Sequence, residues 1–194
     1  MTDEREPPRR VRFEKLQEVH VPDLKRIDVA CAELYWSIGF DAAEVPIRTS
    51  GDFYRLPRTH AVWVADADGT IAGFVAFRDE SPGIGYIEDI AVHPELRRFG
   101  VGRRLIEKAR VELAHLGFDE IVLKVKTNAS WAVTFYEALG FHMLGDPSAL
   151  VDPLAPSVPE RVIAWRAEKV DEPDRPFLRP SEAVYWGLTR SDSN

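Results

Sequence analysis

The chain has 194 residues, of which 45% are hydrophobic and 29% are charged, as is usual for a globular protein of one domain. The net charge of −7 argues against a broad nucleic-acid-binding surface, and no apolar run reaches membrane-spanning length. The single cysteine excludes an internal disulfide, and the charged, proline-bearing start is unlike a signal peptide. We therefore expect a cytoplasmic protein with neither nucleic-acid nor membrane partners.

The N-terminal part predicts a flexible arm, a strand and a helix. Residues 1–10 form the arm, and apolar and polar residues alternate over 11–16, which predicts the first strand. Apolar residues at helical spacing then predict a helix over 21–38. Cys31 lies on this apolar stripe, and the pattern indicates a packed thiol, not a nucleophile. Residues 40–58 predict an irregular or briefly helical segment.

Three successive antiparallel strands follow. The first covers 61–65, and Asp68-Gly69 predicts a hairpin turn because both residues tolerate positive φ angles. The returning strand covers 70–78, and the next covers 85–92. These strands lead directly to the most informative stretch of the chain.

This stretch is a buried strand, a glycine-containing turn and the start of a helix. The helix over 100–116 leaves the amides of its first turn without intrahelical partners, and its dipole adds partial positive charge there. Gly100 and Gly102 remove side chains that would block a ligand. Four arginines add positive charge around the turn: Arg97, Arg98, Arg103 and Arg104. The stretch therefore predicts a binding site for a phosphate chain, although it matches neither a Walker loop nor a dinucleotide fingerprint.

The second half predicts the remaining elements of one domain over 11–170. A strand at 121–125 lies parallel to the strand before the crossover helix. A short helix over 131–139 and strands at 141–144 and 161–170 follow, with a proline-rich loop at 146–160. The aromatic tail over 171–194 predicts docking on the chain's own core or in a homodimer.

Two motifs resemble those of GNAT-type N-acetyltransferases. One is Arg97-x-x-Gly100-x-Gly102 after a strand that ends Ala-Val-His-Pro, and the other is Phe135-Tyr136-x-x-x-Gly140-Phe141. The resemblance covers residues 61–144. It implies an α/β fold with a mixed, mostly antiparallel sheet, a V-shaped split between two central parallel strands, and flanking helices.

The resemblance also implies acetyl-CoA as the co-substrate. In the family, backbone groups of the strand before the turn pair with pantetheine, here at Ile90, Ala91 and Val92. The pyrophosphate-binding residues correspond to Arg97, Arg98, Phe99, Gly100, Val101, Gly102 and Arg103. Further cofactor contacts are expected from Asn128, Trp131 and Phe135. The hydroxyl of Tyr136 corresponds to the group that protonates the leaving thiolate.

An amine acceptor must lose a proton before it attacks, so the reaction needs a base. Glu88 is our candidate because strand alternation places it on one face with Tyr86, Ile90 and Val92, whereas Asp89 is the reserve on the other face. The alternative interpretation of Glu88 is a surface carboxylate on a half-exposed strand.

Two departures from the family pattern bear on the site. Lys124 occupies a place where some relatives have a glutamate, and Ala129 occupies the place of an asparagine. Asn128 stands one residue early; a bulge would restore its contact with the cofactor, and without one it contacts nothing.

We expect direct transfer of acetyl from acetyl-CoA to a primary amine in a ternary complex. The alternative is a catalytically silent acyl-CoA-binding module with the same fold. Antibiotics, polyamines, amino acids, and protein N-termini or lysines all stay open as acceptors, and residues 40–58 and 146–160 are expected to shape the acceptor pocket. No metal site is expected, because the histidines lack the spacing of metal ligands.

Overall fold

The computed structural model describes residues 8, 10–118, 120–126, 128–143 and 162–167. The chain divides into two compact units. The first unit comprises residues 1–76, 89–108 and 185–194, and the second comprises residues 77–88 and 109–184. The proline-rich loop over 146–160, the tail over 171–194 and nearly all of the N-terminal arm lie outside the described residues.

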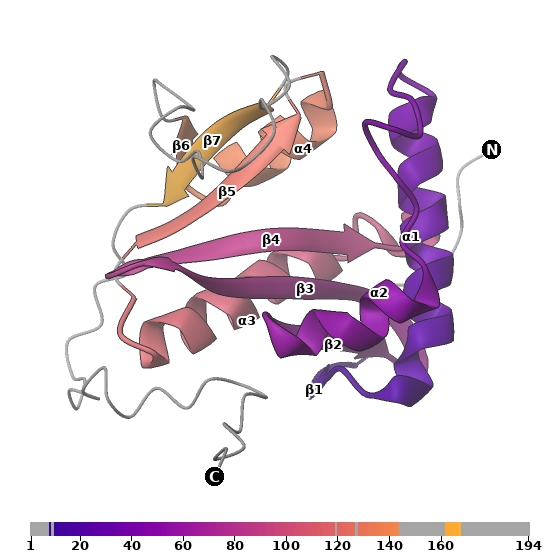
Figure 1. The fold of residues 1–194 in the computed structure, drawn as a ribbon, viewed down its shortest axis with the longest axis horizontal. Coiled ribbons are helices and arrows are strands. Elements are labelled where there is room, and N and C mark those ends of the chain that lie inside the picture. Colours follow the sequence, from indigo (N-terminus) through magenta and orange to yellow (C-terminus); the bar gives the residue numbers. More distant parts are fainter. Residues whose placement is uncertain (1–7, 9, 119, 127, 144–161, 168–194) are drawn as a thin grey trace, which may run out of the picture. The chain divides into compact units, whose positions relative to one another are not determined.

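The first unit contains the helices and strands that lead to the glycine turn (Figure 1). Its complete elements are β1 (Val11–Lys15), α1 (Val21–Trp36), α2 (Ser50–Arg55) and β2 (Ala61–Ala67). It also holds the first part of β3 (Thr70–Ser81), the last part of β4 (Ile84–Val92) and the first part of α3 (Val101–His115). Short 3-10 turns occupy Glu18–His20, Leu56–Arg58 and Pro94–Leu96.

The strand order in the first unit is β1-β2-β3-β4, and β1 pairs antiparallel with β2. The hairpin between β2 and β3 confirms the predicted turn, because Asp68 and Gly69 have φ angles of 52° and 88°. The carboxylate of Asp66 accepts a hydrogen bond from the Gly69 amide at 2.6 Å. At Gly73 the strands approach closely, since a Cβ atom there would lie 2.4 Å from the Ala91 carbonyl oxygen.

A hydrophobic core packs α1 and α2 against the sheet of the first unit. The predicted apolar stripe of α1 accounts for two of its members, Leu24 and Ile27, which are fully buried. The fully buried core residues from other elements are Phe53, Val64, Phe74 and Ala76. The prediction that α1 continues to residue 38 is wrong: the helix ends at Trp36, and Ile38 is exposed. Gly39 has a φ angle of 94°, a left-handed conformation typical of the residues that follow a helix.

The second unit contains the parallel strand pair that the crossover helix predicted. Residues 84–87 of β4 pair with residues 120–123 of β5 (Glu120–Lys126) in parallel register, and β4 and β5 both continue beyond the paired residues. α3 packs closely here, since a Cβ atom on Gly85 would lie 2.6 Å from the Leu113 side chain.

The rest of the second unit is α4 (Ser130–Glu137), β6 (Phe141–Met143) and β7 (Val162–Ala167). The strand order is β3-β4-β5-β7-β6, so the last strand of the chain lies between β5 and β6 (Figure 1). β7 pairs antiparallel with both neighbours. We predicted this strand over 161–170 but did not predict its insertion between two earlier strands.

Candidate functional site

The glycine turn joins β4 to α3 in the first unit. The His93 amide donates to the Ala72 carbonyl of β3 at 2.8 Å, and a 3-10 turn at Pro94–Leu96 follows. Arg98 and Gly100 then have left-handed φ angles of 69° and 79°. A non-glycine residue in this region is uncommon, and such residues are concentrated at ligand-binding turns. Alternating left-handed residues direct successive amides towards one concave side, which suits an anion.

The first turn of α3, which follows the glycine turn, packs into the core through buried side chains. Val101 and Leu105 are buried at 1% and 0% exposure, so the first turn of the helix is fixed to the core. No acidic residue lies in that first turn, which leaves the positive end of the helix dipole without a compensating carboxylate. The side chains of Arg98 and Arg103 are exposed. The turn therefore combines directed amides, a helix N-terminus and exposed cations.

The end of β4 presents backbone groups away from β3. The His93 amide points to β3, and the preceding Val92 carbonyl accepts from the side chains of Arg97 and Cys31 at 3.3 and 3.5 Å. Successive residues of a strand in an antiparallel pair direct their N–H and C=O groups alternately to its two sides. By this alternation, the backbone groups of Ile90 point to the same side as those of Val92, and those of Ala91 point to β3.

Two of the four arginines form side-chain hydrogen bonds with residues outside the glycine turn. Arg97 donates from Nε to the Val92 carbonyl and from Nη2 to the Cys31 sulfur at 3.5 Å. Arg104 donates to the Val11 carbonyl of β1 at 3.1 Å and lies 5.6 Å from the Phe13 ring centre. Arg104 thus directs its guanidinium to β1, and we do not assign its side chain to the phosphates. The side chain of Arg97 fixes the end of β4.

Cys31 has the character of a packed thiol. Burial raises its pKa above the ordinary value of 9.0, and the positive charge of Arg97 only partly offsets that increase. The thiol is thus held protonated near neutral pH, whereas thiolate is the nucleophilic form. Its structural partners are Val92 and Arg97.

This environment predicts slow alkylation of Cys31 in the folded protein. At pH 8 we expect iodoacetamide to modify the native thiol at least about tenfold more slowly than the urea-unfolded chain, because both burial and the raised pKa disfavour reaction. Since the folded pKa is raised above 9.0, Cys31 contributes stability below that pH and loses it as pH rises further. Mass spectrometry of timed samples measures the rate, and equal rates in the two states would contradict the packed thiol.

Glu88 lies in the second unit beside Arg78. Its carboxylate is 3.6 Å from the Arg78 Nε, and 39% of its side chain is exposed. Arg78 makes a closer pair with Glu80 at 2.6 Å and lies 4.9 Å above the Tyr86 ring. Tyr86 and Glu88 thus face the same arginine, which confirms the alternation predicted for this pair. The Glu88 carboxylate is therefore partly accessible to solvent.

Asp89, the reserve base, is held in an ion pair in the first unit. Its carboxylate lies 2.7 Å from Arg48 Nη1. The charge of the Asp89 carboxylate is thus balanced by a guanidinium within the first unit, and Glu88 stays our candidate for the base.

Tyr136 lies on α4 in an aromatic cluster of the second unit. It is buried at 8% exposure, and its ring packs edge-on to Phe135 and Phe141 at centroid distances of 5.2 and 5.7 Å. This packing fixes the direction of the phenol. Ahead of the helix, Ala129 is fully buried and Asn128 is exposed. Trp131 is 38% exposed.

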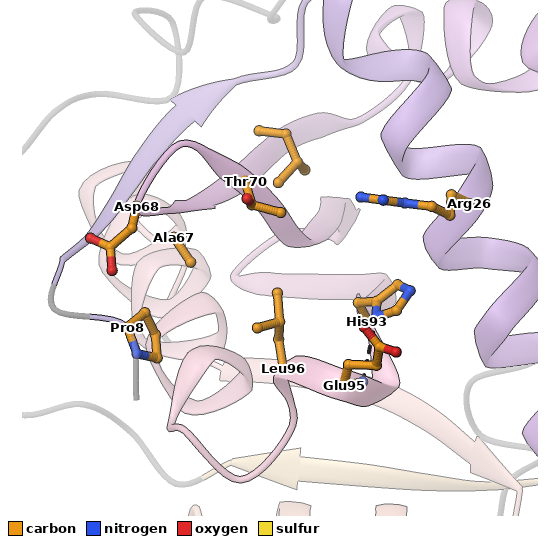
Figure 2. Close-up of a pocket in the computed structure, with 9 residues that line it drawn as sticks. Pro8, Arg26, Ala67, Asp68, Thr70, His93, Glu95 and Leu96 are labelled. Atoms are coloured by element: carbon orange, nitrogen blue, oxygen red, sulfur yellow. Dashed lines mark hydrogen bonds and ion pairs between the residues drawn. The ribbon is translucent and has the colours of Figure 1, made fainter. Parts of the chain in front are cut away.

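A separate pocket of about 320 Å³ lies in the first unit (Figure 2). The residues that line it include Arg26 of α1, Asp68 and Thr70 of the β2–β3 hairpin, and His93, Glu95 and Leu96 before the glycine turn. Figure 2 shows the guanidinium of Arg26 pointing into this space. None of the predicted site residues lines this pocket.

Neither a metal-binding cluster nor a membrane-spanning helix occurs among the described residues. These residues contain no group of three or more histidine, cysteine or carboxylate side chains placed to hold a metal ion. None of the helices in the same part of the chain is both long enough and apolar enough to cross a membrane.

A family model described as "Acetyltransferase (GNAT) family" matches residues 23–141. The chain belongs to the GNAT acetyltransferase family. The match includes the glycine turn and ends at Phe141, the last residue of the second motif.

Curated relatives of this GNAT protein match over limited segments. Mycothiol acetyltransferase of Kocuria rhizophila is 37% identical over 62 residues, which are 32% of this chain and 20% of the relative. An N-alpha-acetyltransferase of Sulfurisphaera tokodaii is 29% identical over 93 residues, which are 42% of this chain and 56% of the relative. The matches thus span about a fifth and about half of the lengths of these relatives.

Solved structures extend the likeness over most of the GNAT protein. An N-acetyltransferase of Thermoplasma acidophilum, solved in complex with coenzyme A, superposes with a TM-score of 0.68 at 15% identity, covering 82% of this chain and 99% of that one. The ribosomal-protein-S18-alanine N-acetyltransferase of Escherichia coli gives 0.61 at 19% identity, covering 87% and 100%. At these identities the likeness shows the fold, and it confirms the predicted mixed α/β architecture with flanking helices.

Proposed function

We propose that this GNAT-family protein transfers the acetyl group of acetyl-CoA to a primary amine by direct attack in a ternary complex. The observation that carries the proposal is the turn between β4 and α3, with left-handed Arg98 and Gly100 leading into a helix N-terminus without acidic residues. This arrangement suits a pyrophosphate, which carries two negative groups and many acceptor oxygens.

The turn leaves room for a ligand beside Gly100. A Cβ atom on Gly100 would meet nothing within 4 Å, so the space beside the turn is open to a ligand. We assign the amides of residues 98–103 and the exposed side chains of Arg98 and Arg103 to the pyrophosphate. Ile90 and Val92 are assigned to the pantetheine arm, with Arg97 fixing the Val92 carbonyl.

The chemistry needs one proton acceptor and one proton donor from the protein. Acetyl-CoA supplies an acetyl group activated as a thioester. Glu88 accepts a proton from the ammonium form of the acceptor, directly or through water, and the neutral nitrogen forms the new C–N bond to the acetyl carbon. The C–S bond breaks, the nitrogen loses a second proton to solvent as the amide forms, and Tyr136 donates its phenolic proton to the departing sulfur. The proton taken by Glu88 returns to Tyr136 through solvent, so the protein is unchanged after one cycle.

The acceptor class is open because the names of the relatives differ in their substrates. One relative is named for mycothiol, another for N-alpha-acetylation and a structural neighbour for an alanine of ribosomal protein S18. We assign the acceptor side of the site to residues 40–58 together with the loop over 146–160, which lies outside the described residues.

The test is an acetyl-CoA-dependent thiol-release assay across peptide α-amines, lysine peptides, polyamines, amino acids and aminoglycosides. We expect release of free thiol and a product heavier by one acetyl group with at least one class. Binding of acetyl-CoA without release across the panel would overturn the enzyme and favour the catalytically silent acyl-CoA-binding module.

A further inference from the structure

In the first unit, one guanidinium pairs with two carboxylates, and the three side chains come from three different segments of the chain. Arg48 lies in the segment over 37–49 that joins α1 to α2, hereafter the α1–α2 segment. Its Nη1 atom lies 2.8 Å from Asp28 Oδ1 on α1 and 2.7 Å from Asp89 Oδ2 on β4. Its backbone amide donates to the second oxygen of Asp28 at 2.7 Å. We call Asp28, Arg48 and Asp89 the Arg48 network.

The three side chains of the network are buried or partly buried, unlike those of an ion pair at the protein surface. Asp28 is 7% exposed, and the side chains of Asp89 and Arg48 are 23% and 31% exposed. Burial lowers the pKa of Arg48, but the carboxylates of Asp89 and Asp28 outweigh burial and raise it. A shielded guanidinium shared by two carboxylates has a defined geometry, and removal of one member leaves the others without full compensation.

The network joins the α1–α2 segment to β4. The segment also has short-range hydrogen bonds: the Trp36 indole donates to the Val45 carbonyl at 3.1 Å, and the Asp41 carboxylate accepts from the amides of Ala43 and Glu44. These bonds shape the segment locally. The Arg48–Asp89 pair is different because it reaches a strand 41 positions further along the chain.

Asp89 lies on β4 between two residues that we assign to the reaction. It follows Glu88, our proposed base, and precedes Ile90, whose backbone we assign to the pantetheine arm. The α1–α2 segment and α2 form the part of the chain that we assign to the acceptor. The Arg48–Asp89 ion pair therefore holds the α1–α2 segment, which we assign to the acceptor, against β4 at the position next to the proposed base.

We propose that Arg48 is a positioning residue for the acceptor amine, acting through its ion pair with Asp89; this inference rests on the proposed function. Arg48 itself contacts neither the reacting atoms nor acetyl-CoA in this account. Its removal is expected to loosen the α1–α2 segment, raise the acceptor KM and leave the affinity for acetyl-CoA unchanged.

The experiment compares Arg48→Lys, Asp89→Asn and a matched control in steady-state kinetics. Lysine keeps the charge but lacks the fork that spans two carboxylates, and asparagine keeps the shape of Asp89 without its charge. For both variants we expect the acceptor KM to rise about tenfold, with the Kd for acetyl-CoA within twofold of the wild type. The control is Arg26→Ala, because Arg26 forms an exposed pair with Asp23 at 3.1 Å on α1, outside the residues assigned to the acceptor and to acetyl-CoA, and we expect no change in KM.

A second readout does not depend on activity. Hydrogen exchange followed by mass spectrometry is expected to show faster exchange of peptides from residues 37–49 in Asp89→Asn, with unchanged exchange in α3. Asp28→Asn is expected to unfold more easily than Asp89→Asn, because Asp28 also accepts the Arg48 amide.

The outcomes separate the inference from the proposed function. A wild-type protein that acetylates no amine would overturn the proposed function, and this inference would fall with it. Wild-type turnover combined with unchanged acceptor KM, or with unchanged exchange over 37–49, in both Arg48→Lys and Asp89→Asn would overturn this inference alone. Loss of acetyl-CoA affinity in these two variants would also overturn it, because it would show a general structural role.

Discussion

Replacement of Tyr136 by phenylalanine is expected to lower kcat for the best acceptor roughly 10²- to 10⁴-fold, the usual range for loss of a general acid. The variant removes one oxygen atom and keeps the ring that packs against Phe135 and Phe141. The Kd for acetyl-CoA, measured by calorimetry, is therefore expected to stay within twofold of the wild-type value. Single-turnover thiol release measures the chemical step directly.

The matched control for this variant is Tyr35→Phe. Tyr35 lies on α1 and packs edge-on to Phe40, and burial raises its pKa to about 12, which makes its phenol a weak acid. We expect this variant to retain kcat within about twofold, since general acid catalysis is most effective when the donor's pKa is near the working pH. Equal kcat values for Tyr136→Phe and the wild type would remove Tyr136 from the mechanism.

Replacement of Glu88 by glutamine is expected to reduce kcat/KM for the acceptor roughly 10²-fold or more near neutral pH. The reason is that an ammonium acceptor must be deprotonated before attack. As pH rises through the pKa of the acceptor amine itself, the neutral amine becomes abundant and the base is no longer needed. The deficit of the variant should therefore shrink with increasing pH, and a pH–rate profile from pH 6 to 10 measures this trend.

Glu80→Gln is the control for the charge around Arg78. Both Glu80 and Glu88 pair with Arg78, at 2.6 and 3.6 Å, so each substitution removes one carboxylate from the same guanidinium. Only Glu88 is assigned to proton transfer, and Glu80→Gln should keep the wild-type pH dependence. A deficit in Glu88→Gln that is constant with pH, or matched by Glu80→Gln, would show an electrostatic role and exclude Glu88 as the base.

Local sequence signals were sufficient to predict the hairpin, the parallel strand pair and the turn around Gly100. Asp68-Gly69 specified its hairpin because few residue pairs accept two positive φ angles in succession. The crossover helix specified the parallel pairing of β4 and β5 because such connections have one hand. Gly100 indicated the left-handed turn, although the same conformation at Arg98 had no signal in the residue type.

Features that depend on long-range pairing were not predicted. The insertion of β7 between β5 and β6 is set by side-to-side pairing of strands distant in sequence, which hydrophobic periodicity does not encode. The same holds for Arg97 and Arg104, whose long side chains donate to the carbonyls of Val92 and Val11. A carboxylate beside the buried stripe of α1, Asp28, was the available signal for the Arg48 network, because buried charges are paired.

The central claim is that the turn from Arg97 to Arg103 binds the pyrophosphate of acetyl-CoA. Calorimetric titration with acetyl-CoA at 50 and 300 mM salt tests it most directly, with acetyl-pantetheine, which lacks the nucleotide and pyrophosphate, as the comparison ligand. We expect one site per chain, an affinity for acetyl-CoA that weakens with salt because arginines contact phosphates, and at least about tenfold weaker binding of acetyl-pantetheine. Absence of binding, or equal affinities for the two ligands, would contradict the assignment of the turn and the enzymatic function built on it.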